Sequence, residues 1–200
     1  NFYQCVDDVD KRLGANPLVI NLPIGAESDF AGVVDLIKMK AITWDSDNLG
    51  ATFKESEIPA DMKADADKWR AKLVEMACEM EDQAMEDYLE GKEIDIVTLK
   101  RCIRKGTLSS KFVPMLCGSS FKNKGVQLLL DSVVDYLPSP QDLIQITGIS
   151  VDGDAEIIRK IDDNDPFSAL AFKIMTDPFV GALTFVRVYS GKLESGSYIL

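Results

Sequence analysis

Histidine is missing from this sequence, and acidic residues far outnumber basic ones. The 200 residues include no His, 22 Lys and Arg, and 33 Asp and Glu. Without His, the chain has no His general base, no His metal ligand and no Ser–His or Cys–His nucleophile pair. The formal net charge of −11 argues against a generic nucleic-acid-binding surface, although it is compatible with a local basic face.

Cysteine and long hydrophobic runs are scarce as well. The four cysteines lie in apolar or helical contexts and form no Cys-x-x-Cys pair: Cys5, Cys78, Cys102 and Cys117. This spacing favours reduced thiols in a protein core over a zinc site or a disulfide framework. No apolar run approaches the roughly 20 residues that span a bilayer, and the first residues do not resemble a signal peptide. We therefore expect a cytoplasmic protein with no membrane partner.

The stretch Lys111–Pro140 organises the rest of the chain. The apolar run Phe112–Cys117 predicts a buried strand, because strands covered on both faces are apolar throughout. The polar residues Gly118–Gly125 predict a turn, and apolar residues at helical spacing predict a helix that ends before Pro138. In open α/β sheets, ligands bind at the carboxyl ends of the strands, where we expect this turn to lie.

The patterns on either side of this stretch predict further elements. Before it we expect a helix that ends at Gly14, a small antiparallel sheet, one long helix and a second helix. Their residues are 2–13 for the first helix, 18–24, 31–37, 40–44 and 50–55 for the strands, and 59–90 and 94–108 for the last two helices. After it we expect strands at 167–173, 183–189 and 197–200. The Asp-rich segments 152–154 and 162–165 do not follow the order of a calcium loop, so we predict turns there.

Acidic side chains recur along one side of the predicted helix 59–90. They are Glu75, Glu79, Asp82 and Glu86, spaced to line the face opposite the apolar residues. Two interpretations remain open: a solvated helix face, or a docking face whose charge speeds the association of a basic partner. The next predicted helix carries cations toward its C-terminus, where they suit the helix dipole: Lys100, Arg101, Arg104 and Lys105.

Four stretches of the sequence together resemble one family of proteins. They are Arg12–Pro17, Leu22–Glu27 with Gly32–Leu36, Cys117–Gln127 continued by Asp135–Pro140, and Asp177–Gly181 with Arg187–Gly191. In these stretches the chain resembles bacterial elongation factor G, the translational GTPase that drives tRNA and mRNA movement on the ribosome. The third stretch, beginning CGSSFKNKGVQ, is the most diagnostic.

The resemblance implies a multidomain protein of the α/β and α+β classes. Residues 1–16 resemble a helix of the GTPase domain, residues 17–110 an inserted α+β subdomain called G-prime, and residues 111–140 the last strand and helix of the P-loop GTPase sheet. Residues 141–200 resemble a linker and the start of a truncated antiparallel translation-factor β-barrel. The missing initiator Met and an end inside a predicted strand agree with a piece of a longer chain.

The resemblance also implies binding roles. Ser119, Ser120 and Phe121 would form the turn that contacts the guanine base, mainly through backbone N–H groups. The family usually has Ala where this chain has Ser120. The acidic residues Glu75, Glu79, Asp82 and Glu86 would bind the ribosomal stalk protein, and the barrel would contact ribosomal RNA. The parent protein would use GTP or GDP together with Mg.

The catalytic parts of a GTPase are absent from the sequence. It has no Gly-x-x-x-x-Gly-Lys-Ser/Thr phosphate loop, no Asn-Lys-x-Asp motif and no identifiable switch segments. Because phosphoryl transfer needs these parts together, we expect a monomeric segment with no catalytic residue and no metal site, which by itself neither binds GTP tightly nor hydrolyses it. Two other hypotheses remain open: a stand-alone module that docks a basic partner through its acidic helix, and a related ribosome-protection or release GTPase.

Overall fold

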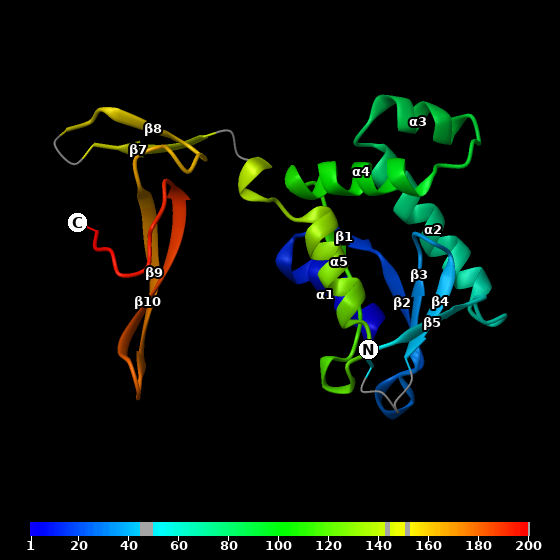
Figure 1. Cartoon of the computed structure of the whole chain (residues 1–200). Helices are drawn as coiled ribbons and strands as arrows, with labels where there is room; N and C mark the ends of the chain where they lie inside the picture. Colours follow the sequence, from blue (N-terminus) through cyan, green and yellow to red (C-terminus); the bar gives the residue numbers. More distant parts are fainter. Residues whose placement is uncertain (45–49, 143–144, 151–152, 200) are drawn as a thin grey trace. The chain divides into compact units, whose positions relative to one another are not determined.

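The computed structural model describes residues 1–44, 50–142, 145–150 and 153–199. The chain divides into two compact units, Asn1–Leu137 and Pro138–Leu200. All five α-helices of the described residues belong to the first unit, whereas the described part of the second contains strands, turns and the short 3₁₀ segment η4 (Pro140–Asp142) (Figure 1). Within these described ranges, no helix is long and apolar enough to cross a membrane.

The first unit alternates helices with short strands. Its strands are β1 (Pro17–Val19), β2 (Asn21–Ile24), β3 (Gly32–Asp35), β4 (Lys40–Trp44), β5 (Phe53–Ser56) and β6 (Val113–Met115). Its α-helices are α1 (Phe2–Leu13), α2 (Lys63–Cys78), α3 (Asp82–Leu89), α4 (Ile96–Leu108) and α5 (Val126–Tyr136). Among the described residues of this unit, two short 3₁₀ segments lie in loops, η1 (Glu27–Asp29) and η3 (Ser120–Lys122).

Helix α1 confirms the prediction for residues 2–13. The Asn1 side chain accepts a hydrogen bond from the Tyr3 amide at the start of the helix. Gly14 ends the helix in the left-handed conformation, with φ of 62°. Glycine is common at this position because it adopts positive φ without a Cβ clash.

The predicted strand 18–24 is wrong as a single strand, because its residues form two strands in two sheets. β1 pairs in parallel with β6, whereas β2 pairs in antiparallel with β3. Ile20 links the two pairings: its amide donates to the Met115 carbonyl at 2.9 Å, and its carbonyl accepts from the Leu36 amide at 3.0 Å. A continuous apolar run predicts burial but does not indicate with which neighbour each residue pairs.

The predicted antiparallel sheet is confirmed, with the strand order β2-β3-β4-β5. Val33 and Val34 on β3 and Ile42 on β4 are fully buried, so the central strands are covered on both faces. β-Branched side chains suit such a pleated, packed surface. Gly32 lets β3 and β4 approach closely, because a Cβ at this position would lie 2.1 Å from the Ile42 carbonyl oxygen.

The predicted continuous helix 59–90 is wrong, because α2 and α3 are separate helices with a break at Glu79–Glu81. The amides of Met80 and Glu81 donate to carbonyls only three residues back, and Glu81 is then extended, with φ of −148°. The break places Asp82 in the first turn of α3, where a negative charge interacts favourably with the helix dipole. Neither Gly nor Pro marks the break, and the apolar spacing continues across it.

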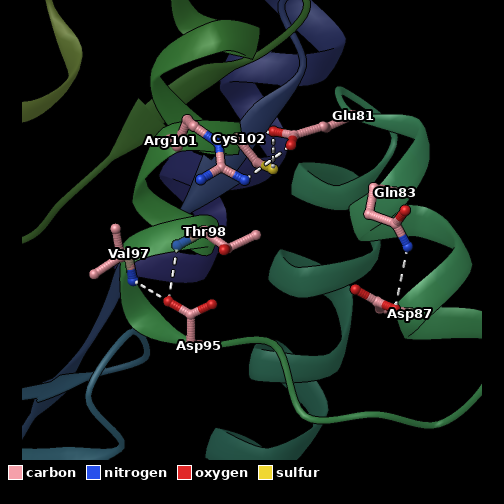
Figure 2. Close-up of polar contacts among 8 residues, drawn as sticks. All are labelled: Glu81, Gln83, Asp87, Asp95, Val97, Thr98, Arg101 and Cys102. Atoms are coloured by element: carbon pink, nitrogen blue, oxygen red, sulfur yellow. Dashed lines mark hydrogen bonds and ion pairs between the residues drawn. The ribbon is translucent and has the colours of Figure 1, made fainter.

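Helices α4 and α5 confirm the helices predicted before and after the turn. The predicted buried strand 112–117 is wrong in extent and burial, because β6 covers only Val113–Met115 and Val113 is exposed. The Asp95 carboxylate caps α4 by accepting hydrogen bonds from the amides of Val97 at 2.8 Å and Thr98 at 3.0 Å (Figure 2). α4 packs closely on the residue before β6, because a Cβ on Gly106 would lie 2.1 Å from the Phe112 ring.

One hydrophobic core contains buried residues from all five helices and from β1, β2 and β3. Representative members are Val6, Leu18, Leu22, Val34, Leu73, Ala84, Leu99, Ile103, Phe112 and Tyr136. The segments 1–16 and 111–137 therefore share a core with the segment 17–110. The division of the first unit into a GTPase part and an inserted subdomain stays a prediction.

The second unit consists of antiparallel strand pairs, β7 (Gln145–Ile149) with β8 (Glu156–Lys160) and β9 (Ser168–Asp177) with β10 (Gly181–Ser190). β9 and β10 confirm the predicted strands 167–173 and 183–189. The predicted strand 197–200 is wrong for its described residues 197–199, which form no strand.

The predicted turn at 162–165 is confirmed, and the Asn164 amide closes it by donating to Asp162 Oδ1 at 2.9 Å. The predicted turn 152–154 lies partly outside the described residues. The described strands close no barrel. The protein is therefore a mixed α+β protein with five helices and several small sheets among its described residues.

Candidate functional site

The Gly118–Phe121 turn follows β6, at the carboxyl end of the one parallel strand pair among the described residues. Its base is closed by two backbone hydrogen bonds, from the Ser119 amide to the Lys124 carbonyl at 2.8 Å and from the Lys124 amide to the Ser119 carbonyl at 2.9 Å. Gly118 is required there, because a Cβ would lie 2.8 Å from the Lys124 carbonyl oxygen. The turn is thus a small closed loop of defined backbone geometry.

The outer part of this turn is exposed and has free hydrogen-bond donors. Phe121 is 98% exposed, and Ser120 is exposed as well. In the part of the chain that the structure describes, the amides of Ser120 and Phe121 donate to no protein acceptor. Consecutive free amides at a strand end form a site for an acceptor oxygen. The predicted residues Ser119, Ser120 and Phe121 thus lie together in a geometry suited to backbone recognition.

A cavity of about 670 Å³ lies beside the turn. Its walls come from residues 1–3 at the start of α1, residues in the segment 23–30, and residues 117–119 of the turn itself. This volume is within the range of small-molecule sites in proteins, about 300–1,000 Å³. The sequence did not predict that the N-terminal helix and the β2–β3 connection would adjoin the turn.

Two of the four thiols are buried, as predicted. Cys78 and Cys102 are buried and free, whereas Cys5 is exposed, so the prediction of a core thiol is wrong at this position. Cys5 lies on the outer side of the amphipathic helix α1, where helical context does not imply burial. Burial raises the pKa of the Cys102 thiol to about 11 and that of the half-buried Cys117 thiol to about 12.

The four predicted partner-binding carboxylates are exposed: Glu75, Glu79, Asp82 and Glu86. Among the described residues, none of them accepts a side-chain hydrogen bond or joins an ion pair. They do not form the predicted single stripe, because Glu75 and Glu79 lie at the end of α2 and Asp82 and Glu86 on α3. We call these four residues the acidic pairs.

Acidic residues next to these pairs are occupied within the molecule. Glu81 accepts two hydrogen bonds from Arg101, and the Cys102 thiol lies 3.8 Å from the same carboxylate (Figure 2). Asp87 accepts from Gln83 at 3.4 Å and from Lys92 at 2.8 Å. Glu81 and Asp87 therefore contribute less free negative charge to this region than the acidic pairs do.

The predicted basic side of α4 is largely used for internal contacts. Lys100 forms an ion pair with Asp135 at 2.6 Å, and Arg104 donates to the carbonyls of Asp135 and Leu137 at the end of α5. With Arg101 bound to Glu81, these cations tie α4 to its neighbours rather than forming a free basic face. Sequence spacing gave no sign of these partners, which lie far away along the chain.

An exposed apolar surface runs along β6 and α5. Its exposed members are Val113, Leu129, Leu130, Val133, Val134 and Leu137. Part of it surrounds a largely apolar cavity of about 250 Å³ between α4, β6 and α5. Within the described residues, β6 pairs with β1 alone, so its other edge has no neighbouring strand.

The residues present do not fit a magnesium–phosphate centre. The described residues contain no cluster of three or more His, Cys, Asp or Glu side chains able to hold a metal ion. The sequence supplies no phosphate loop either. The turn therefore provides hydrogen-bond donors for a ligand but no site for its phosphates or for a metal.

No protein-family model matches the chain. Among solved structures, it is similar to the crystal structure of a protein from Thermus thermophilus, with a TM-score of 0.73 and 25% sequence identity. The similarity covers 98% of this chain and 26% of that protein. The chain thus spans about a quarter of the length of this relative.

Proposed function

We propose that this chain is part of a ribosome-dependent GTPase of the elongation factor G type, in which the Ser119–Phe121 turn contacts the guanine base. The observation that carries this proposal is the exposed turn, with free amides at Ser120 and Phe121, at the end of a parallel strand. Guanine carries a ring-carbonyl oxygen that such amides bind. Ser120, where the family usually has Ala, is compatible with this role because a backbone contact tolerates either side chain.

The apolar surface of β6 and α5 supports a larger sheet. Exposed apolar patches of this kind are typical of surfaces that pack against other protein segments. In the proposed protein, further strands of the GTPase sheet extend β6. The phosphate loop, the switch segments and the Mg that acts with GTP are assigned to segments outside these 200 residues.

The proposal assigns a role to each part of the chain. Residues 1–16 and 111–140 belong to the GTPase domain, residues 17–110 form the inserted subdomain, and residues 141–200 begin a β-barrel that contacts ribosomal RNA. The acidic pairs dock the stalk protein of the ribosome, whose basic side chains complement their charge. The protein acts in the cytoplasm and couples GTP hydrolysis to translocation.

Nucleotide binding by the longer protein that contains this chain tests the proposal. We expect it to bind GDP in preference to ADP and to hydrolyse GTP faster when ribosomes are added. The 200-residue chain is the matched control, and we expect neither tight binding nor hydrolysis from it. Equal affinity for GDP and ADP, or hydrolysis that ribosomes do not stimulate, would contradict the proposal.

A second candidate is a stand-alone interaction module, which the exposed and unpaired carboxylates of the acidic pairs favour. Such a module would bind its basic partner through the 200-residue chain alone, with the same affinity whether or not nucleotide is present. A third candidate, a ribosome-protection or release GTPase, would bind guanine nucleotides but would not support translocation. A translocation assay separates it from the first proposal.

A further inference from the structure

Asn21 joins β2 to the residue that precedes the Gly118–Phe121 turn. Its side chain is 1% exposed, and its Oδ1 accepts a hydrogen bond from the Cys117 amide at 2.8 Å, while its Nδ2 lies 3.4 Å from the Cys117 carbonyl oxygen. An amide side chain carries one donor and one acceptor face, so it can replace a peptide group in a strand ladder. The side chain of Asn21 therefore extends the parallel pairing of β1 with β6 beyond the end of these strands. The backbone of Asn21 pairs instead with β3.

Two lysines bind the turn to the loop between β2 and β3. Lys122 Nζ donates to the carbonyls of Glu27 at 3.1 Å and Ser28 at 2.9 Å, and Lys124 Nζ donates to the Phe30 carbonyl at 3.0 Å. Charged donors form stronger hydrogen bonds than neutral ones. Neither ammonium group pairs with a carboxylate among the described residues, so backbone carbonyls are their partners here.

These contacts reach the turn from both sides. Asn21 fixes its start at Cys117, and the two lysines fix the segment that follows Phe121. Every partner lies between residues 21 and 30, on β2 or in the loop after it. The loop itself has a constrained backbone, because Gly25 adopts φ of 78° and a Cβ there would lie 2.1 Å from the Asp29 carbonyl oxygen.

We propose that Asn21, Lys122 and Lys124 are positioning residues that hold the Gly118–Phe121 turn in its ligand-binding conformation. The inference rests on the proposed function, because it takes the ligand of the turn to be the base of a guanine nucleotide. Its physical basis is preorganisation: amides that are already fixed lose less freedom when they bind an acceptor. The three side chains touch no part of the base themselves and act only through the backbone of the turn.

Amide hydrogen exchange in this chain tests the positioning role directly. In the double variant Lys122→Met/Lys124→Met, and separately in Asn21→Leu, we expect the amides of Ser119 and Lys124 to exchange about tenfold faster. Amides of α2 should be unaffected, because none of the hydrogen bonds removed involves a residue of α2. Lys111→Met is the matched control, since Lys111 is exposed and its side chain has no partner among the described residues.

The conservative double variant Lys122→Arg/Lys124→Arg separates positioning from a general loss of packing. Arginine also donates to backbone carbonyls, so we expect this variant to restore slow exchange at Ser119 and Lys124. Exchange in Lys122→Met/Lys124→Met that stays within about twofold of Lys111→Met would overturn the inference, as would a failure of the Arg variant to restore protection.

Nucleotide release from the longer protein then separates this inference from the proposed function. We expect a fluorescent GDP analogue to dissociate about tenfold faster from Lys122→Met/Lys124→Met than from Lys111→Met. Faster amide exchange with unchanged GDP dissociation would overturn the link between the positioning residues and the base. A wild-type protein that binds no guanine nucleotide would overturn the proposed function, and the exchange measurement would still decide whether these residues order the turn.

Discussion

Arg101 on α4 donates two hydrogen bonds to the carboxylate of Glu81, at 2.9 Å through Nε and at 2.8 Å through Nη2 (Figure 2). Glu81 is the residue immediately before α3, so this pair holds the break between α2 and α3 against α4. A bidentate pair of this kind is geometrically specific, because the planar guanidinium matches the two carboxylate oxygens. The pair therefore helps to define where the acidic residues on either side of the break lie.

Replacement of Arg101 should change how stability depends on pH. The hydrogen bonds from Arg101 lower the pKa of Glu81 below its ordinary value of 4.5. A carboxyl whose pKa is lowered by folding stabilises the protein above its ordinary pKa and loses this contribution as the pH falls through the folded value. We therefore expect Arg101→Gln to lower the free energy of unfolding at neutral pH, with a difference from wild type that fades below pH 4.5.

Denaturant unfolding at several pH values provides the measurement. Arg12→Gln is the control, because it breaks the exposed pair between Arg12 and Asp8 within one helix. Such exposed pairs contribute only about 0–1 kcal/mol. If the free energy of unfolding differed between Arg101→Gln and wild type by the same amount down to low pH, the Arg101–Glu81 pair would not be the source of the difference.

Gly106→Ala should destabilise the first unit, although Ala is the better helix former. A Cβ at Gly106 would lie 2.1 Å from the Phe112 ring, which must then move. Overpacking a core costs about 1–3 kcal/mol, whereas Ala gains roughly 1 kcal/mol over Gly within a helix. Thermal unfolding of Gly106→Ala checks this expectation. Adding Phe112→Leu should recover part of the loss, and a double variant less stable than both single variants would contradict the steric explanation.

Cys5 should react with an alkylating reagent before the buried cysteines do. Cys5 is exposed, whereas Cys78 and Cys102 are buried, and the pKa of the Cys102 thiol is raised to about 11 by burial. Because the thiolate is the reactive form, iodoacetamide at about pH 8 should modify Cys5 first and Cys102 only after unfolding. Mass spectrometry of digested samples gives the order. Cys5→Ser should remove the fast phase, and fast labelling of Cys102 in the folded protein would contradict its burial.

Charge reversal on α2 should weaken binding of the longer protein to ribosomes. We expect Glu75→Lys/Glu79→Lys to slow association on the order of tenfold at low salt, because like charges then oppose the basic partner. The difference should shrink as salt is raised and screening increases. Association kinetics with purified ribosomes at several salt concentrations provide the measurement.

The control for this prediction has the same change in net charge at other sites. Asp10 and Asp61 are exposed residues of the first unit, and their side chains have no partner among the described residues. The variant Asp10→Lys/Asp61→Lys should therefore bind ribosomes much as wild type does. Equal effects of the two double variants would attribute the change to overall charge and would remove the docking role of Glu75 and Glu79.

The sequence predicted correctly those helices and turns that are specified by residues close together in the chain. The apolar spacing of α1, α4 and α5 reports one buried face, and Gly14 marks an end of α1 because its backbone adopts positive φ. The turn residues Ser119, Ser120 and Phe121 lie together simply because they are adjacent in the chain. The pairing of β1 with β6 was missed, since the two strands are far apart in sequence and nothing local specifies their register.

Long-range polar contacts were also missed, yet one of them left a sign in the sequence. Asn21 interrupts the otherwise apolar run Leu18–Ile24, and a polar side chain within a buried strand requires a hydrogen-bond partner. The pattern thus indicates that a partner exists but cannot identify it as Cys117. The same limit applies to Arg101 and Glu81, whose pairing follows from the packing of α4 against α2, just beyond whose end Glu81 lies.

A pair of substitutions at Ser120 tests most directly whether the backbone of the turn contacts the guanine base. Ser120 is the first residue of η3 and follows the extended residue Ser119, so Pro at this position removes the free N–H while remaining compatible with the backbone. In the longer protein we expect Ser120→Ala to bind a fluorescent GDP analogue within about twofold of wild type and Ser120→Pro to bind about tenfold more weakly. Unchanged affinity in Ser120→Pro, or an equal loss in Ser120→Ala, would contradict recognition of the base by the backbone of this turn.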